Sequence, residues 1–124
     1  MKVSFDYDDT LSIEFVQSYA ELLVSRGIDV WIVTARHADG KNGDIYNTAG
    51  KLGIPKERIV FTDMKPKATF FKGSNFIWHL DDRANELTAI NNNTNVKGVW
   101  VLDDRTWMGT CERLIKYHQS SPEL

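Results

Sequence analysis

The sequence contains a single cysteine, Cys111, and no group of cysteines and histidines with the spacing of zinc ligands. A lone cysteine cannot close an internal disulfide, so neither a disulfide framework nor a structural zinc site is expected, and a reducing cytoplasm is the predicted compartment. No apolar run approaches membrane-spanning length, and the amino-terminal MKVSFDYDDT reaches acidic residues too early for a signal peptide. No membrane partner is therefore expected.

An excess of charge of one sign is also missing. The formal net charge of −2 gives no overall basic field to attract nucleic acid or a membrane, although a local basic patch remains open. Apolar residues make up 42% of the 124 residues and charged residues 26%, which are the proportions of an ordinary folded protein. One domain over residues 1–124 is expected, long enough to bury a core without crosslinks.

What the chain does contain is a regular alternation of apolar, β-branched runs with helical patterns. The expected strands are residues 2–6, 28–34, 58–62, 75–80 and 97–102. The expected helices are 13–26 with Ser12 as its cap and Gly27 as its stop, 44–52 before Gly53, 66–72 before Gly73, 84–90 and 106–119. This alternation predicts an α/β fold with a single doubly wound, parallel, five-stranded sheet.

In such a sheet the ligand binds beyond the carboxyl ends of the strands, so the residues after each strand are the functional candidates. They are Asp6, Asp8 and Thr10, then Thr34 and Arg36, then Lys65 and Lys67, and finally Asp81 and Asp82. Each alone is a common turn, cap or surface residue. Together they suit phosphoryl transfer, since paired carboxylates bind Mg²⁺, one carboxylate can accept a phosphoryl group, and a lysine can neutralise it.

Four segments in this order resemble the motifs of the haloacid dehalogenase (HAD) superfamily of phosphohydrolases. They are FDYDDTL (5–11), WIVTAR (31–36), MKPKATFF (64–71) and IWHLDD (77–82). The resemblance covers residues 3–82 and implies a HAD-like, Rossmann-type core that forms an aspartyl-phosphate with Mg²⁺ as cofactor.

The resemblance also implies a role for individual residues. Asp6 would be the nucleophile and a metal ligand, and Asp8 the general acid and base as well as a metal ligand through its backbone carbonyl. Thr34 would donate a hydrogen bond to the phosphoryl group. Asp81 and Asp82 would complete the Mg²⁺ site, with Asp82 as the direct ligand of the two.

Two basic positions stay open at this stage. Lys67 begins the short helix that leads into IWHLDD and is preferred as the catalytic lysine, while Lys65 is the alternative or a substrate-binding residue. Arg36, in TAR, parallels the arginine of S-G-R in the phosphatase domain of phage polynucleotide kinase-phosphatase and is a candidate for substrate binding. A surface charge at the start of the loop is the competing interpretation of Arg36.

The chain leaves no room for the cap domain that many HAD enzymes insert beside the first or second motif. The site is therefore expected to be open. The resemblance then implies a bulky phosphorylated substrate, such as a polynucleotide end, or an oligomer whose neighbour covers the site. A free nucleotide fits if loop 37–43 acts as a lid.

Two other classes compete with a phosphatase. IVFTDMKP resembles the phosphoacceptor segment of a two-component receiver domain, with Asp63 in the acceptor position, but the order of threonine, aspartate and lysine differs from that of receivers. A catalytically inactive HAD-like binding module is the other alternative, and it is disfavoured because all the acidic motifs are complete.

The segments IWHLDDR (77–83) and VWVLDDR (99–105) end alike. In a HAD-type sheet, ordered 5-4-1-2-3, only the first of them ends beside the strand that leads to Asp6. Asp103 and Asp104 end the edge strand instead and are expected to cap the last helix or to pair with Arg105.

Overall fold

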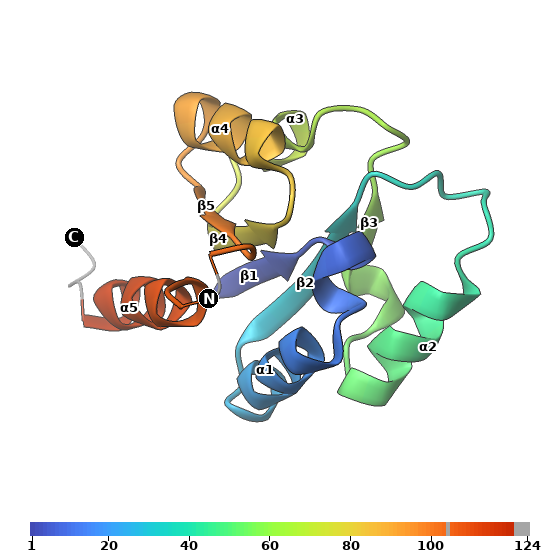
Figure 1. Cartoon of the computed structure of the whole chain (residues 1–124), viewed down its shortest axis with the longest axis horizontal. Coiled ribbons are helices and arrows are strands. Elements are labelled where there is room, and N and C mark those ends of the chain that lie inside the picture. Colours follow the sequence, from blue (N-terminus) through green and yellow to red (C-terminus); the bar gives the residue numbers. More distant parts are fainter. Residues whose placement is uncertain (104, 121–124) are drawn as a thin grey trace.

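The computed structural model describes residues 1–103 and 105–120, and it contains one five-stranded sheet whose strands are all parallel (Figure 1). The strands are β1 (Lys2–Phe5), β2 (Asp29–Thr34), β3 (Ile59–Phe61), β4 (Phe76–Asp81) and β5 (Lys97–Trp100). The helices and helical turns are η1 (Tyr7–Leu11), α1 (Glu14–Ser25), α2 (Gly43–Leu52), η2 (Lys56–Arg58), α3 (Lys67–Phe71), α4 (Ala84–Asn93) and α5 (Trp107–Ser120). The expected fold class, α/β with a single parallel five-stranded sheet between helices, is confirmed.

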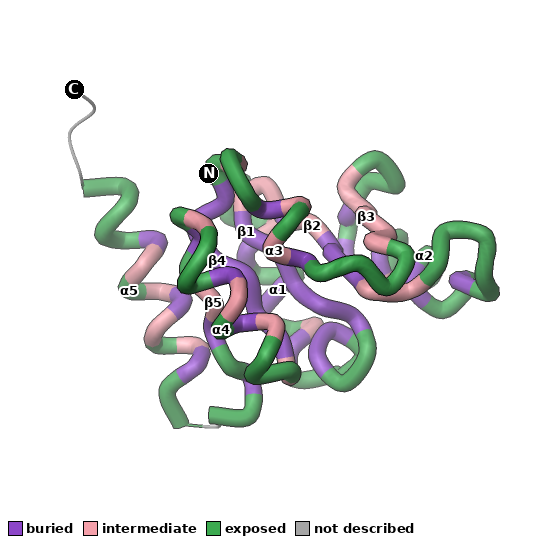
Figure 2. Tube along the Cα trace, turned by 90° about the horizontal axis from the view of Figure 1, so that it is seen from above, coloured by how far each residue is buried: buried purple, intermediate pink, exposed green. Residues whose placement is uncertain are grey.

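The helices lie in two layers, one on each face of the sheet. Figure 1 shows α3 and α4 on one face and α1, α2 and α5 on the other. Buried side chains fall into two clusters that match these layers, one built on β1, α1, α2 and α5 and a smaller one that joins α3 to α4. The outer turns of α5 are exposed, whereas the central strands are buried (Figure 2).

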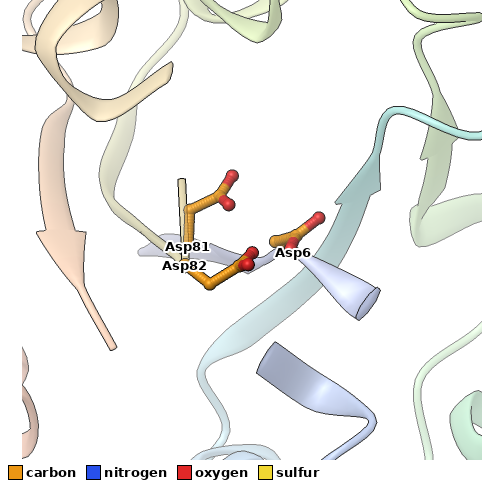
Figure 3. A group of neighbouring side chains, drawn as sticks. All are labelled: Asp6, Asp81 and Asp82. Atoms are coloured by element: carbon orange, nitrogen blue, oxygen red, sulfur yellow. The ribbon is translucent and has the colours of Figure 1, made fainter. Parts of the chain in front are cut away.

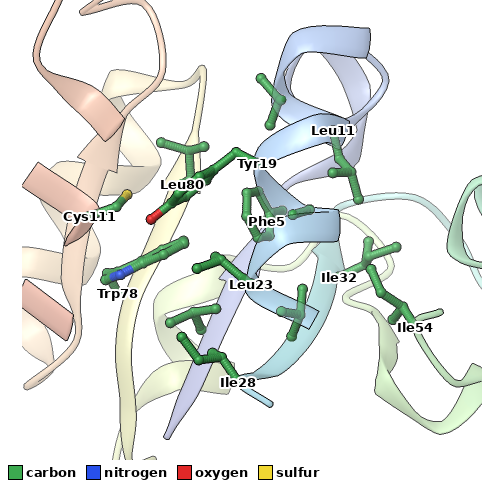
Figure 4. Packing of buried hydrophobic residues seen from close by; sticks show 14 of the residues in the cluster. Phe5, Leu11, Tyr19, Leu23, Ile28, Ile32, Ile54, Trp78, Leu80 and Cys111 are labelled. Atoms are coloured by element: carbon green, nitrogen blue, oxygen red, sulfur yellow. The ribbon is translucent and has the colours of Figure 1, made fainter. Parts of the chain in front are cut away.

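The larger cluster is organised around aromatic rings (Figure 4). Phe5 meets Trp78 edge-on at a centroid distance of 5.4 Å, and Tyr19 meets Trp107 in the same way at 5.5 Å. The first contact joins β1 to β4 and the second joins α1 to α5. Tyr19 connects the helices to the strands, since its ring lies 6.4 Å from the rings of both Phe5 and Trp78, and such ring contacts add to the stability gained from burying their area. They hold the two strands that carry the acidic motifs in one rigid layer.

The order of the strands, β3-β2-β1-β4-β5, sets the position of the site. The chain runs outward from β1 to β3 and then returns to the other side of β1 to form β4. In a sheet of this kind, the crevice beyond the carboxyl ends of the strands opens where the direction reverses, which here is between β1 and β4. Asp6 and Asp82 directly follow these two strands, and Asp81 ends β4.

Several predicted element boundaries need correction. Ser12 does not cap α1, whose amino-terminal flanking residue is Ile13; the Ser12 hydroxyl instead accepts a hydrogen bond from the backbone N–H of Asp9 at 3.1 Å. The chain turns tightly after β1, and Asp9 lies in the left-handed region with φ of 58°. The serine is therefore used to close that turn rather than to begin the helix.

Helix α4 runs to Asn93, past the predicted end at Ile90, so part of the polar run NNNTN is helical. The Asn93 side chain donates to the carbonyl of Ala89 at 2.8 Å, and the Asn91 side chain accepts from the N–H of Gly98 at 2.8 Å. The first of these bonds lies within α4 and the second joins α4 to β5, and together they offset the low helix propensity of asparagine. The short turn η2 before β3 was not predicted either.

The three glycines expected to stop helices are all in left-handed conformations, with φ of 79° at Gly27, 81° at Gly53 and 77° at Gly73. Gly27 and Gly53 follow the ends of α1 and α2, whereas α3 ends at Phe71 and Lys72 is already extended, so Gly73 belongs to the turn after the helix.

The backbone carbonyl of Asp103 accepts hydrogen bonds from the N–H groups of Thr106 and Trp107, so Asp103 binds the start of α5 with its backbone. Asp104, the other residue expected to cap or to pair there, lies outside the described residues.

Among the helices of the described part of the chain, none is both long and apolar enough to cross a membrane.

We predict that Gly98→Ala destabilises the protein by about 1–3 kcal/mol, because the added Cβ would lie 2.9 Å from Cδ2 and 3.1 Å from the carbonyl oxygen of Leu87 in α4. Gly50→Ala in α2 is the matched control, since nothing lies within 4 Å of its added Cβ, and a gain of about 0.5–1 kcal/mol is expected there. Urea unfolding of both variants measures the difference. Equal effects would show that β5 does not pack closely on α4.

Candidate functional site

Three carboxylates meet at the carboxyl ends of β1 and β4. One oxygen atom from each of Asp6, Asp81 and Asp82 can be chosen so that all lie within 4.8 Å of one another. Figure 3 shows Asp81 and Asp82 projecting from the end of β4 beside Asp6 at the end of β1. The backbone N–H of Asp6 donates to the carbonyl of Leu80 at 2.8 Å, which extends the β1–β4 pairing up to the site.

The ammonium group of Lys67 lies between two of these carboxylates. Its Nζ donates to Asp6 Oδ1 at 2.7 Å and to Asp81 Oδ2 at 2.6 Å, and only 1% of the residue is exposed. Lys67 is the first residue of α3, so its position is fixed by the packing of that helix on the sheet. The alternative lysine, Lys65, is exposed and lines the mouth of the pocket.

Burial raises the pKa of Asp6 to about 8, and the nearby charge of Asp81 adds to the effect, although Lys67 opposes it. Burial also raises the pKa of Asp82. Carboxylates that gather with too little positive charge retain protons, and a hard cation between them would release those protons. The donor set of carboxylate oxygens is the kind that Mg²⁺ prefers, so the residues present fit such an ion.

Asp81 differs from the other two carboxylates. Burial raises its pKa, but hydrogen bonding to His79 and the charge of Lys67 outweigh that effect and hold the pKa below its usual range. Its Oδ2 lies 2.6 Å from Lys67 Nζ and 2.8 Å from His79 Nε2, and its Oδ1 accepts from the N–H of Arg83 at 3.1 Å. Asp81 is thus directed inward, whereas Asp82 lines the open pocket.

The Asp8 carboxylate is turned toward Arg36 rather than toward the three clustered carboxylates. The guanidinium of Arg36 donates to both oxygens of Asp8, at 2.9 and 2.7 Å, and to both oxygens of Asp44, at 2.7 and 2.9 Å. It also lies 5.3 Å from the ring centroid of Tyr7. Hydrogen bonding to Arg36 lowers the pKa of Asp44.

Thr34 is buried at the end of β2, and its hydroxyl accepts a hydrogen bond from the backbone N–H of Arg36 at 3.3 Å. Its neighbours Ala35 and Arg36 line the pocket, whereas Thr34 is not among the lining residues. Thr10 is also buried, and its hydroxyl donates to Asp6 Oδ2 at 3.3 Å. Each hydroxyl therefore supports a neighbouring site residue.

Asp6, Asp82 and Lys67 line an open pocket of about 230 Å³. Its lining comes from the ends of β1, β2 and β4 and from the starts of α3 and α4: Asp6, Asp8, Asp9, Ala35, Arg36, Met64, Lys65, Lys67, Asp82, Arg83, Asn85 and Glu86. A wider hollow beside it is formed by loop 37–43, and Arg36 and Met64 line both spaces. Within that loop, Asn42 is buried and donates to the carbonyl of His37 at 2.9 Å.

Half of the pocket lining was among the sequence candidates: Asp6, Asp8, Arg36, Lys65, Lys67 and Asp82. Asp44 and His79, which bind Arg36 and Asp81, were not among them. Asp44 was assigned only to a helix, and nothing in the local sequence indicates that it binds Arg36. His79 is a buried, hydrogen-bonded core residue, and its place two positions before Asp81 in β4 puts both side chains on one face of the sheet. This alternation of side chains along the strand is the sequence pattern that indicates a contact between His79 and Asp81.

The strand order also bears on the receiver alternative. Receiver domains have the order 2-1-3-4-5, with the third strand beside the first. Here β4 occupies that place and β3 is at the edge. Asp63, the acceptor in that interpretation, has φ of 53°, and its carboxylate accepts from the backbone N–H of Ala38 at 3.0 Å. The receiver interpretation is therefore wrong for this topology.

No protein-family model matches the sequence, and a search of curated proteins returns no match.

We predict a pH-dependent stability that comes from Asp6 in the metal-free protein. The folded-state pKa of about 8 lies above the unfolded value of 3.8, so this stabilisation is complete below about pH 4 and is lost as the pH rises through about 8. Asp6→Asn removes the titration, so its melting temperature should fall less than that of the wild type over this range. Thermal melts in EDTA measure the difference.

The exposed variant Asp9→Asn is the control and should follow the wild type. Added Mg²⁺ should stabilise the wild type most at the alkaline end, where the carboxylates no longer need to lose protons to bind it. Parallel curves for the wild type and Asp6→Asn would contradict the raised pKa of Asp6.

Proposed function

We propose that this protein is a Mg²⁺-dependent phosphatase of the HAD type that hydrolyses a phosphomonoester through an aspartyl-phosphate on Asp6. The observation that carries the proposal is the position of the Asp6 carboxylate. It lies at the switch point of the sheet, 2.7 Å from Lys67 Nζ, beside Asp82 and open to the pocket. The strand order, which is the one implied by the resemblance to the HAD superfamily, also supports it.

In the proposed reaction an oxygen of Asp6 attacks the phosphorus atom, and the bond to the leaving oxygen breaks. Asp8 donates a proton to that oxygen, and it later takes a proton from the water that hydrolyses the aspartyl-phosphate, releasing phosphate. Lys67 neutralises the charge between Asp6 and the phosphoryl group. Mg²⁺, held by Asp6 and Asp82 with the backbone carbonyl of Asp8, would supply further neutralising charge.

Arg36 is proposed to bind the substrate phosphate and to control the position of Asp8. Its guanidinium lies at the junction of the two hollows, and Asp44 attaches it to the first turn of α2. A phosphate that enters the pocket can replace Asp8 as a partner of Arg36 while Asp44 keeps the guanidinium in place. Asp8 is then free to exchange a proton with the substrate.

The proposed substrate is a phosphorylated nucleotide or polynucleotide end. Only η1 and α1 lie between β1 and β2, and only α2 and η2 lie between β2 and β3, so no cap covers the pocket in the described chain. An open pocket beside a second hollow suits a phosphate on a larger molecule. The competing function is a catalytically inactive HAD-like binding module, which would have the same fold and bind phosphate without turnover.

We predict that the wild type releases phosphate from an aryl phosphate and from phosphorylated oligonucleotides only with Mg²⁺. Asp6→Asn should lower kcat by at least about 10³-fold, because the amide cannot act as the nucleophile. Asp103→Asn is the control, because Asp103 is exposed beyond the end of β5 and does not line the pocket, and its kcat should stay within about threefold of the wild type. Phosphate release is followed colorimetrically over a panel of 3′- and 5′-phosphorylated substrates.

Turnover that persists in Asp6→Asn would refute the aspartyl-phosphate mechanism. Binding of phosphate and Mg²⁺ without turnover on any substrate would favour the inactive binding module.

A second prediction concerns Arg36. Arg36→Ala should raise KM by about 10-fold or more, because a charge-assisted hydrogen bond to the substrate phosphate is lost. Arg26→Ala is the matched control, since Arg26 makes an equivalent ion pair with Glu112 between α1 and α5, away from the pocket. Steady-state kinetics of both variants test the assignment, and an equal KM in the two would assign Arg36 to structure alone.

A further inference from the structure

Ser4 and His79 form a polar pair inside the sheet. They lie directly opposite each other in the register of β1 and β4, and neither has any exposed surface. The Ser4 Oγ and His79 Nδ1 atoms are 2.8 Å apart. Burying polar groups at the centre of a sheet costs stability unless they are hydrogen-bonded, so a pair of apolar residues would be the simpler solution here.

The pair lies directly behind the candidate site. Side chains alternate between the faces of a strand, so Ser4 shares its face with Asp6, and His79 shares its face with Asp81. His79 Nε2 is 2.8 Å from Asp81 Oδ2, and the same oxygen binds Lys67 Nζ. Hydrogen bonds therefore run without a gap from Ser4 through His79, Asp81 and Lys67 to Asp6.

The direction of these hydrogen bonds follows from the groups involved. An ionised carboxylate only accepts, so the Nε2 atom of His79 donates its hydrogen to Asp81. With that hydrogen on Nε2, the Nδ1 atom of a neutral imidazole is an acceptor, and the Ser4 hydroxyl 2.8 Å away is its donor. Ser4 thereby fixes the tautomer that His79 needs in order to bind Asp81.

His79 also contacts the helix that carries the lysine. Its ring lies 4.9 Å from the ring of Phe71, at the end of α3, and Lys67 is the first residue of the same helix. The imidazole thus touches both the carboxylate that holds the ammonium group and the helix from which the lysine projects.

We infer that Ser4 and His79 are positioning residues for the candidate active site: they hold Asp81 from behind and so set the place at which Lys67 meets Asp6. The inference rests on the proposed function, because the phosphatase reaction is what the position of Lys67 serves. Asp81 in this arrangement orients the lysine, and Asp82 is left for the cation. Residues that orient a catalytic group in this way usually affect turnover by about 10–100-fold when removed.

The test compares three substitutions of His79. Glutamine can place an amide N–H near the position of Nε2, whereas asparagine reaches only the position of Nδ1 and leucine has no donor. We expect His79→Leu and His79→Asn to lower kcat by about 10–100-fold with KM changed less than about threefold, and His79→Gln to recover much of the loss. Equal kcat in all three, or a wild-type kcat in His79→Leu, would overturn the inference.

Ser4→Ala tests the same inference independently. It should lower kcat in the wild-type background but add nothing to His79→Leu, because Ser4 acts only through the imidazole. Val30→Ala, in the buried part of β2, is the control for a loss of core stability and should leave kcat unchanged at a temperature at which it is folded. Additive effects of Ser4→Ala and His79→Leu would contradict the chain of contacts.

Two readouts do not need turnover and separate this inference from the proposed function. Nitrogen-15 NMR of the imidazole should show the neutral tautomer with hydrogen on Nε2 in the wild type, and a crystal structure of His79→Leu should show Lys67 Nζ moved out of hydrogen-bonding distance of Asp6. The opposite tautomer, or an unmoved lysine, would overturn the positioning role. If the wild type releases no phosphate from any substrate, the proposed function fails and these two measurements alone decide the inference.

Discussion

The buried ammonium group of Lys67 is the interaction on which the candidate site depends. It lies between Asp6 and Asp81 with 1% of the residue exposed, and it joins α3 to the ends of two strands. Removing such a charge from water is costly, and the cost is offset only because two carboxylates bind it at short distance. Without the lysine, the gathered carboxylates would repel one another across the switch point.

One ammonium group does not balance three carboxylates, and the imbalance is distributed unevenly. Asp81 has His79 and a backbone N–H as further partners, so its charge is the better stabilised, whereas the pKa values of Asp6 and Asp82 are raised. Without a metal ion, the site therefore has an excess of negative charge beside the pocket. A hard cation would supply the balancing positive charge, and in the proposed reaction it would also offset the negative charge of a phosphoryl group beside Asp6.

The fold and most of the site could be predicted from local sequence patterns. Alternation of apolar runs with helical periodicity indicated the parallel sheet, and the strand ends indicated Asp6, Asp81 and Asp82. The place of Lys67 at the start of a helix favoured it over Lys65, but the sequence left both open, because the choice depends on which side chain packing directs inward. Asp44 was missed since its contact with Arg36 joins a loop and a helix whose relative position is a tertiary property.

The sequence by itself determined the order of strands and helices along the chain, the left-handed glycines after α1 and α2 and the set of charged groups at the strand ends, because these depend on residue type and near neighbours. Tertiary structure alone decided that Asp81 is directed inward, that Asp8 is held by Arg36, and that Ser4 and His79 support the site. These contacts join residues far apart in the chain, and their geometry follows from strand order and register. Local periodicity does not encode either of these.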